Sequence, residues 1–232
     1  MIVTVFRSRL KPGVRDEYVT LANRMNELAR TIPGYVSHKD FYADDGERVA
    51  VVEFANEEGQ RAWQTNPEHR AAQKLAREKF YSEYHIQVCT RSRVKIQTVR
   101  RSDGAGLTAS SWPSGIVDSR KESQLMLITV FRTRVRPGLR DEYAAAVDRM
   151  SELARTMPGY ISHKSFYAED GERCTIVEFE HEQGLRTWRT NPEHLVAQKM
   201  ARQKYYTEYS VQVCTLERES KFKLPEAAAA QT

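Results

Sequence analysis

The sequence predicts an α+β protein made of two similar halves, each with the element order β-α-β-β-α-β. One observation behind this prediction is an internal repeat in the chain of 232 residues: residues 62–69 return almost letter for letter as residues 187–194. The other observation is hydrophobic periodicity. In each half, stretches that alternate apolar and polar residues flank stretches with the apolar spacing of a helix.

The first half begins with a strand, a helix and a hairpin. Residues 2–10 alternate and are rich in β-branched side chains, which predicts a strand. In residues 16–30 the apolar side chains recur every three or four positions, which predicts a helix with one buried face. Residues 35–43 and 48–54 are predicted strands. The turn between them contains Gly46, so we expect them to be antiparallel neighbours.

A helix break follows the hairpin. Residues 57–65 are predicted to be helical, and Asn66-Pro67 interrupts that helix. Asn66 is a good N-cap, and Pro67 suits the first helical position because no N–H is needed there. A second helical segment is therefore expected over residues 67–79, and a last strand over residues 81–94.

This element order is that of the ferredoxin-like split βαβ unit, a four-stranded antiparallel sheet with two helices on one face. The strands also carry apolar residues such as Val3, Val5 and Val49 on the opposite face, which is too apolar to meet water. Each sheet therefore needs a second layer of cover, and the two halves of the chain could provide it for each other.

The repeat and the composition divide the chain into four parts. Residues 1–94 form the first ferredoxin-like repeat and residues 124–219 the second. Between them, residues 95–123 are rich in Gly, Ser and Pro, which is typical of a linker, and we expect Trp112 to pin this linker onto one domain. The tail at residues 220–232 contains a run of alanines and is expected to be disordered.

Charge and cysteine content narrow the class of protein. The net charge is +5, but Lys and Arg are interleaved with Asp and Glu, so no nucleic-acid partner is expected. No apolar run approaches membrane-spanning length, and residues 1–7 alternate like a strand, so we expect neither a membrane partner nor a cleaved signal. Cys89, Cys174 and Cys214 form no CxxC pair, which indicates reduced, packed thiols and a cytoplasmic location.

One set of residues in the first repeat comprises residues 1–6, Met25 with Pro33-Gly34-Tyr35, Val52-Glu53-Phe54, and Trp63 with Pro67-Glu68-His69, Tyr81 and Tyr84. This pattern, which covers both repeats, resembles that of the antibiotic biosynthesis monooxygenase family. The resemblance implies a fold of the dimeric α+β barrel superfamily, in which two chains pack their sheets face to face. Here one chain carries both halves, so we expect an intramolecular dimeric α/β barrel. A homodimer of such pseudo-dimers and pairing between chains both stay open.

His69 and His194 are the predicted catalytic residues. If Asn66 caps the helix, His69 lies at the third helical position, near the positive end of the helix dipole, and should be neutral at pH 7. A neutral imidazole can accept a proton from a phenol or an activated carbon. The alternative is structural, because a polar side chain at this position can reach back to the N-cap backbone.

The other candidate residues are aromatic or polar side chains at equivalent places in both repeats. Trp63 lies six residues before His69 and could line a flat pocket or fill the core. His38 lies in the middle of a strand, where it could line a cleft or pair at an interface. The predicted substrate-binding residues are Trp63, Trp188, Asn66, Asn191, His38, His163, Tyr81 and Tyr206.

The sequence favours chemistry without a cofactor. The histidines and cysteines lack metal-ligand spacing, and neither GxGxxG nor a P-loop occurs, so no metal and no nucleotide cofactor are expected. The resemblance implies a cofactor-independent oxygenase, in which the protein deprotonates a phenolic substrate and the carbanion reacts with dioxygen. We therefore predict a monooxygenase that acts on a small aromatic or polyketide-like molecule.

Three alternatives remain at this point. The first is a non-catalytic small-ligand-binding or stress-associated barrel protein, because no residue cluster is unmistakably catalytic. The second is a module for protein assembly. The third is a haem-degrading monooxygenase, but such relatives use an Asn of the first strand, and residues 2–10 and 127–135 contain none.

Overall fold

The computed structural model describes residues 1–98 and 125–225, with side chains described for residues 1–92 and 125–225. The elements of the first repeat are β1 (Ile2–Leu10), α1 (Arg15–Arg30), β2 (Tyr35–Tyr42), β3 (Arg48–Phe54), α2 (Glu57–Thr65), α3 (Pro67–Leu75), the π-helical turn η1 (Ala76–Phe80) and β4 (Tyr81–Thr98). Those of the second are β5 (Leu127–Val135), α4 (Arg140–Arg155), β6 (Tyr160–Tyr167), β7 (Arg173–Phe179), α5 (Glu182–Thr190), α6 (Pro192–Met200), the π-helical turn η3 (Ala201–Tyr205) and β8 (Tyr206–Lys223).

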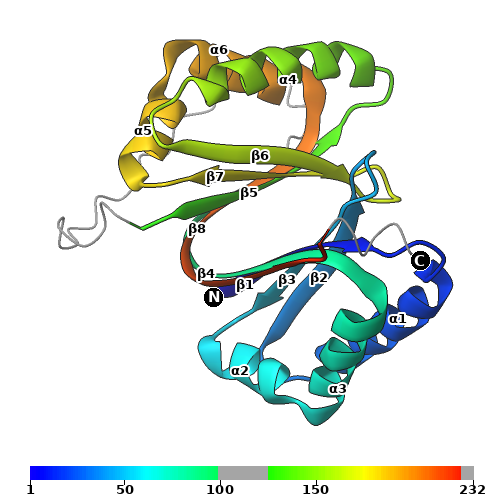
Figure 1. Cartoon of the computed structure of the whole chain (residues 1–232). Coiled ribbons are helices and arrows are strands. Elements are labelled where there is room, and N and C mark those ends of the chain that lie inside the picture. The colour runs from blue at the N-terminus through cyan, green and yellow to red at the C-terminus, as the bar shows by residue number, and fades with distance from the viewer. Residues whose placement is uncertain (99–124, 226–232) are drawn as a thin grey trace. The chain divides into compact units, whose positions relative to one another are not determined.

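Each repeat forms a four-stranded antiparallel sheet with its helices on one face. In the first repeat β1 pairs with β3 and β4, and β3 pairs with β2, so the strand order is β4-β1-β3-β2. The second repeat has the equivalent order β6-β7-β5-β8. Figure 1 shows α1–α3 on one face of the first sheet and α4–α6 on one face of the second. The predicted α+β class and the two ferredoxin-like repeats are confirmed.

Aromatic side chains fix the first helix onto the sheet. Tyr18 of α1 meets Phe80 and Tyr81 edge to face, with ring centroids 5.9 and 5.7 Å apart. Phe6 of β1 packs against Tyr81 at 5.6 Å. Such contacts add to the energy gained from burying the rings, so α1 is held over β1 and β4 at a defined position. The second repeat builds the same cluster from Tyr143, Tyr205 and Tyr206.

The predicted helix break is present in both repeats, and each of its parts has a cap. The side-chain oxygen of Asn56 accepts a hydrogen bond from the N–H of Gly59 at 2.9 Å and begins α2. Asn66 does the same for the N–H of His69 at 3.1 Å and begins α3, with Pro67 at its first position. Asx side chains are strong N-caps, so the chain turns at a defined residue.

The end of the second helical segment differs from its prediction. A single helix was expected over residues 67–79, but α3 ends at Leu75 and a π-helical turn follows. The N–H of Tyr81 donates to the carbonyl of Ala76, five residues back. This wider turn buries Phe80 and presents its carbonyl to the N–H of Lys11 at 2.8 Å. Tertiary contacts therefore override the local helical pattern.

Both repeats end in longer strands than expected. β4 continues to Thr98, into the predicted linker, whereas Trp112 lies outside the described residues. β8 continues to Lys223, so the chain is ordered past residue 220, where the tail was expected to begin. The physical reason is packing on β4: Phe222 stacks on Tyr84 at 5.5 Å. The last residues of the tail, 226–232, also lie outside the described part of the chain.

Two segments of the second repeat belong to the compact unit that forms around the first. This unit contains residues 1–93, 165–174 and the described part of 214–232; the other unit contains the remaining described residues. Within the first unit Tyr42 of β2 pairs with Tyr167 of β6, and Lys39 bonds to Glu172 at 2.6 Å. The complete pairing of both sheets into one barrel stays a prediction.

Gly59 offers a test of how tightly α2 meets the loop before β2. A Cβ at this position would lie 2.4 Å from the carbonyl oxygen of Pro33 and 3.2 Å from the ring of Phe54. Gly59→Ala should therefore lower the free energy of unfolding by about 1–3 kcal/mol, because overpacking forces neighbours to move. Urea unfolding measures this. The exposed Glu58→Ala should stay within about 0.5 kcal/mol of the wild type, and equal effects of both variants would contradict the expected clash.

Candidate functional site

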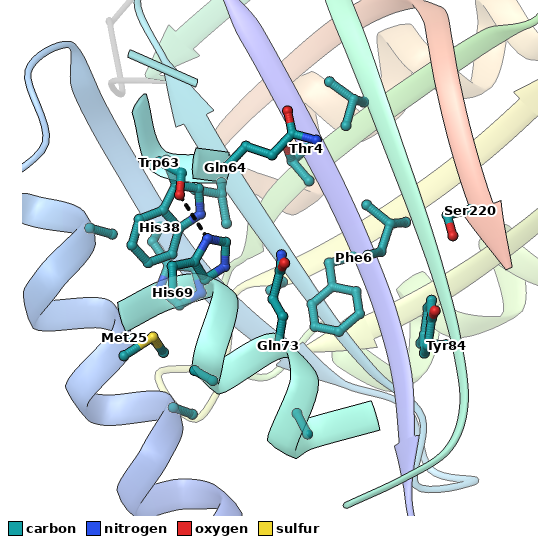
Figure 2. Close-up of a pocket in the computed structure, with 18 of the residues that line it drawn as sticks. Thr4, Phe6, Met25, His38, Trp63, Gln64, His69, Gln73, Tyr84 and Ser220 are labelled. Carbon is teal, nitrogen blue, oxygen red and sulfur yellow. Dashed lines mark hydrogen bonds between the residues drawn. The ribbon is translucent and has the colours of Figure 1, made fainter. Parts of the chain in front are cut away.

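A cavity of about 390 Å³ lies on the helix-covered face of the first sheet. Its lining side chains come from β1–β4, α1–α3, η1 and residues 218–220 of β8, all of which belong to the first unit. Figure 2 shows Trp63, His69 and His38 among these residues. Apolar walls with a few polar groups are typical of sites for small molecules.

Trp63 and His69 are joined across the helix break. Their rings stack with centroids 3.7 Å apart and an angle of 15°. Nδ1 of His69 lies 2.9 Å from the carbonyl oxygen of Trp63, the dashed line in Figure 2. A carbonyl only accepts hydrogen bonds, so Nδ1 carries a proton and Nε2 is left with a lone pair. The ring therefore does not reach back to the N-cap N–H, which was the structural alternative.

Burial keeps His69 neutral. It lowers the pKa of His69 from its ordinary value of 6.5 to about 4, although the hydrogen bond to Trp63 works in the opposite direction. The neutral form expected at pH 7 thus arises mainly from desolvation, which disfavours the charged ring, and in smaller part from the positive charge of Arg77. Nε2 is consequently an acceptor at neutral pH, but it belongs to a weak base.

The second repeat copies this pair. Trp188 and His194 stack at 3.7 Å and 16°, and Nδ1 of His194 lies 2.9 Å from the Trp188 carbonyl. Burial lowers the pKa of His194 too. In the second repeat the side-chain amide nitrogen of Gln198 also lies 3.3 Å from Nε2 of His194. The two histidines therefore share a geometry.

His38, Asp40 and Arg48 form a network on the same face of the sheet. Nε2 of His38 lies 2.9 Å from Asp40 Oδ1, and Nη2 of Arg48 donates to the same oxygen at 2.6 Å. Burial opposes ionisation of Asp40, but the hydrogen bond from His38 and the charge of Arg48 outweigh it and lower the pKa of Asp40. Asp40 is therefore a carboxylate at pH 7, and His38 must carry a proton on Nε2 to donate to it.

Arg48 is buried between aromatic rings. Its side chain is 8% exposed, and its guanidinium carbon lies 5.6 Å from the ring of Tyr18 and 5.9 Å from that of Phe6. Burial works against its charge, but Tyr18 and Asp40 outweigh this effect and raise the pKa of Arg48. The cation is thus permanent, and it holds Asp40 in place as an anion.

The second repeat replaces this network. Ser165 stands where the first repeat has Asp40, and it accepts a hydrogen bond from Arg173 at 2.5 Å. His163 is bonded through Nδ1 to the hydroxyl of Tyr160 at 2.7 Å. In the second repeat Nδ1 of the strand histidine therefore has a hydroxyl partner.

The remaining predicted residues divide into lining and capping groups. Tyr81 lines the cavity, and its hydroxyl lies 3.4 Å from that of Tyr18. Burial raises the pKa of Tyr81, so its phenol stays protonated. Tyr206 pairs in the same way with Tyr143. Asn66 is not one of the lining residues of this cavity, because its side-chain oxygen caps α3, as that of Asn191 caps α6.

The same organisation recurs in known proteins. A family model for antibiotic biosynthesis monooxygenase matches residues 1–75 and again residues 126–200. The chain belongs to the antibiotic biosynthesis monooxygenase family. Because the family model matches twice, the predicted tandem duplication is confirmed. No curated protein matches the chain.

Several solved structures are similar to this chain. An aldoxime dehydratase is similar at 12% identity and a TM-score of 0.60, over 96% of this chain and 83% of its own. An anthrone oxidase-like protein has 12% identity and a TM-score of 0.36 over 97% and 95% of the two chains. SnoaB from Streptomyces nogalater, a cofactor-independent oxygenase, has 16% identity and a TM-score of 0.33 over 44% and 94%. These likenesses concern the fold alone.

Three features of other protein classes are absent from the described residues: a membrane-spanning helix, a metal-ligand cluster and a disulfide. Within residues 1–98 and 125–225, no helix is both long and apolar enough to cross a membrane. In the same residues, no group of three or more His, Cys, Asp or Glu side chains is placed to hold a metal ion. All three cysteines are buried and free of disulfides.

Sequence reasoning for this family member did not single out Arg48 and Arg218, which line the cavity, or Asp40, which bonds to the lining residues His38 and Arg48. Asp40 shares the strand face of His38, so alternation could have pointed to it. Arg48 is a charged residue at the start of a mostly apolar strand, which is also a detectable signal. Arg218 of β8 donates hydrogen bonds to the side-chain oxygens of Gln60 and Gln64 at 3.0 Å each. A local sequence pattern cannot predict a contact between residues so far apart in the chain.

The lowered pKa of His69 predicts a dependence of stability on pH. Between pH 6.5 and about 4 the unfolded chain protonates His69 but the folded chain does not, so stability falls as the pH falls through this window. From pH 7 to pH 5 this contribution amounts to about 2 kcal/mol. His69→Gln should make urea-derived unfolding free energies less dependent on pH by that amount. Equal losses in variant and wild type would contradict the assignment.

The Asp40–Arg48 pair predicts a selective loss of stability. Asp40→Ser, which copies the residue of the second repeat, should lower the free energy of unfolding by about 2 kcal/mol, because a buried cation loses its charged acceptor. Asp45→Ser provides the matched control: it breaks an Asp–Arg pair with Arg9 at 2.5 Å in which Asp45 is half exposed, and it should cost less than about 1 kcal/mol. Thermal and urea unfolding measure both losses of stability. A larger loss for Asp45→Ser than for Asp40→Ser would contradict the prediction.

Proposed function

We propose that this protein is a cofactor-independent monooxygenase that oxidises a small aromatic or polyketide-like molecule with dioxygen. The observation that carries the proposal is the neutral His69, which lines a cavity and keeps the lone pair of Nε2 free of the Trp63 bond. Family membership supports the reaction class. The cytoplasmic location predicted from the thiols and the pairing of the repeats within one chain belong to the same proposal.

The proposed oxidation uses His69 as a base and Trp63 as an aromatic surface beside it. His69 accepts a proton from a phenol or from a carbon activated by an adjacent ring, and the electron pair stays on the substrate. The resulting carbanion is itself the reductant of dioxygen. It forms a carbon–oxygen bond, and the second oxygen atom leaves as water when the carbon becomes a carbonyl. Trp63 serves as a flat surface against which a planar substrate can stack.

The weak basicity of His69 sets a requirement on the rest of the site. A ring with a pKa of about 4 is neutral at pH 7, but it offers little driving force for taking a proton from a phenol. Other groups in the cavity must therefore favour the ionised substrate or share the proton. Polar lining groups that could do so include the hydroxyl of Tyr81 and the imidazole of His38, which is bonded to Asp40.

We extend the proposal to His194 and Trp188 of the second repeat, whose geometry is the same. Their surroundings differ, because Leu185 and Arg189 stand where the first repeat has Gln60 and Gln64. We therefore expect the two repeats to prefer different substrates.

A second candidate function is ligand binding without catalysis. It is favoured by the same low pKa of His69. A weak base whose Nδ1–H donates to a carbonyl can use Nε2 to orient a bound hydroxyl group without taking its proton. In that case the protein would bind aromatic ligands in the cavity and consume no oxygen. Calorimetric binding together with an oxygen electrode separates the two candidates.

The proposal predicts a loss of oxygenation when both histidines are removed. In oxygen-uptake assays with anthrones and hydroquinones, the His69→Ala/His194→Ala variant should lose activity by a factor of about 100 or more, the usual contribution of a general base. Thermal unfolding would establish that the double variant is folded at the assay temperature. Unchanged uptake by a folded double variant would remove the catalytic role of these residues.

A further inference from the structure

His38 is held as part of a dyad with an ionised carboxylate. Its side chain is only 9% exposed, and Nε2 donates to Asp40, which Arg48 holds as an anion. His38 also lines the cavity and is one of the residues labelled in Figure 2. Its second nitrogen, Nδ1, has no hydrogen-bond partner among the described residues.

Asp40 fixes which ring nitrogen of His38 is the acceptor. A carboxylate only accepts hydrogen bonds, so the neutral imidazole keeps its proton on Nε2 and its lone pair on Nδ1. The same carboxylate stabilises the imidazolium that forms when Nδ1 takes up a proton. His69 lacks such support, since the partner of its protonated nitrogen is the uncharged carbonyl of Trp63.

We infer that in the first repeat Nδ1 of His38 accepts the substrate proton in place of the weak base His69, which then orients the bound hydroxyl group through Nε2. Asp40 is the positioning residue of His38. This inference rests on the proposed function and deepens it. The substrate's O–H or C–H bond breaks, its electron pair stays on the substrate, and the proton moves to Nδ1. Arg48 acts through Asp40, because its charge keeps the carboxylate ionised inside the protein.

The substrate class follows from this arrangement. A lone pair held in a fixed direction beside an aromatic wall selects a molecule that offers a hydrogen-bond donor on a flat ring, as a phenol or the enol form of an aryl ketone does. A carboxylic acid would already be ionised at pH 7 and would offer no proton. It would also bring a second negative charge close to Asp40.

The second repeat lacks the carboxylate of this dyad, and its strand histidine uses the corresponding nitrogen for another bond. Ser165 replaces Asp40, and Nδ1 of His163, the nitrogen that corresponds to the acceptor, bonds to the hydroxyl of Tyr160. We therefore assign proton transfer through the strand histidine to the first repeat alone. Duplication has left two copies of the histidine but only one copy of the carboxylate.

The first test asks which imidazole nitrogen senses a bound phenol. The wild-type protein is labelled with ¹⁵N-histidine, the six histidine spin systems are assigned with single His→Asn variants, and 1-naphthol or naphthalene is titrated in. The wild type should show His38 as the Nε2–H tautomer, and 1-naphthol should move its Nδ1 signal whereas naphthalene should not. An Nδ1–H tautomer, or a phenol that moves only His69 Nε2 or neither nitrogen, would overturn the inference.

The second test measures turnover in the His194→Ala background, with anthrone as substrate in an oxygen electrode. His38→Asn should lower kcat about 100-fold or more with KM changed less than about threefold. Asp40→Ser should lower kcat about tenfold to a hundredfold and mix the two tautomers of His38, and Asp40→Glu should restore part of both. His181→Asn is the matched control, because an Asn caps the equivalent helix at Asn56.

The two tests separate this inference from the proposed function. A kcat unchanged in folded His38→Asn would overturn the role of His38 even if the enzyme consumes oxygen. If the wild type consumes no oxygen but 1-naphthol moves His38 Nδ1, the monooxygenase proposal fails and the phenol-binding assignment stands.

Discussion

The hydrogen bond from His69 to the Trp63 carbonyl organises the candidate site. This carbonyl lies at the end of α2, where the chain stops being helical, and its oxygen also accepts a hydrogen bond from the N–H of Asn66 at 3.3 Å. Asn66 and Pro67 restart the helix in a new direction, which brings the ring of His69 back onto the turn it has just left. The bond and the stacking follow from that change of direction, and burial keeps the imidazole neutral.

The helices, the strands and the helix break could be predicted from short stretches of sequence. The π-helical turn and the side-chain pairs of the site depend on contacts between residues that are distant in the sequence. Asn66-Pro67 could be recognised because a cap and a first-turn proline act within a few residues. The π-helical turn could not, because it depends on the burial of Phe80 and on its bond to Lys11. Nor could the pairing of Asp40 with Arg48, which requires the register of the β2–β3 hairpin.

The two repeats show which parts of the site tolerate change independently. The Trp–His pair keeps the same distances in both, because it is made by one short segment that carries its own cap. The strand network is different: it depends on two strands, and exchanging one carboxylate for a hydroxyl changes the partner of the arginine. Features confined to one segment thus survive duplication more easily than features shared between segments.

The end of β8 lies among the lining residues of the first cavity. Arg218, Glu219 and Ser220 come from the last part of the described chain, yet they border a cavity whose other residues come from the first 88 positions. During synthesis the N-terminal repeat therefore leaves the ribosome with one wall of its cavity still missing. A first repeat produced alone would therefore lack the part of the cavity wall that β8 supplies.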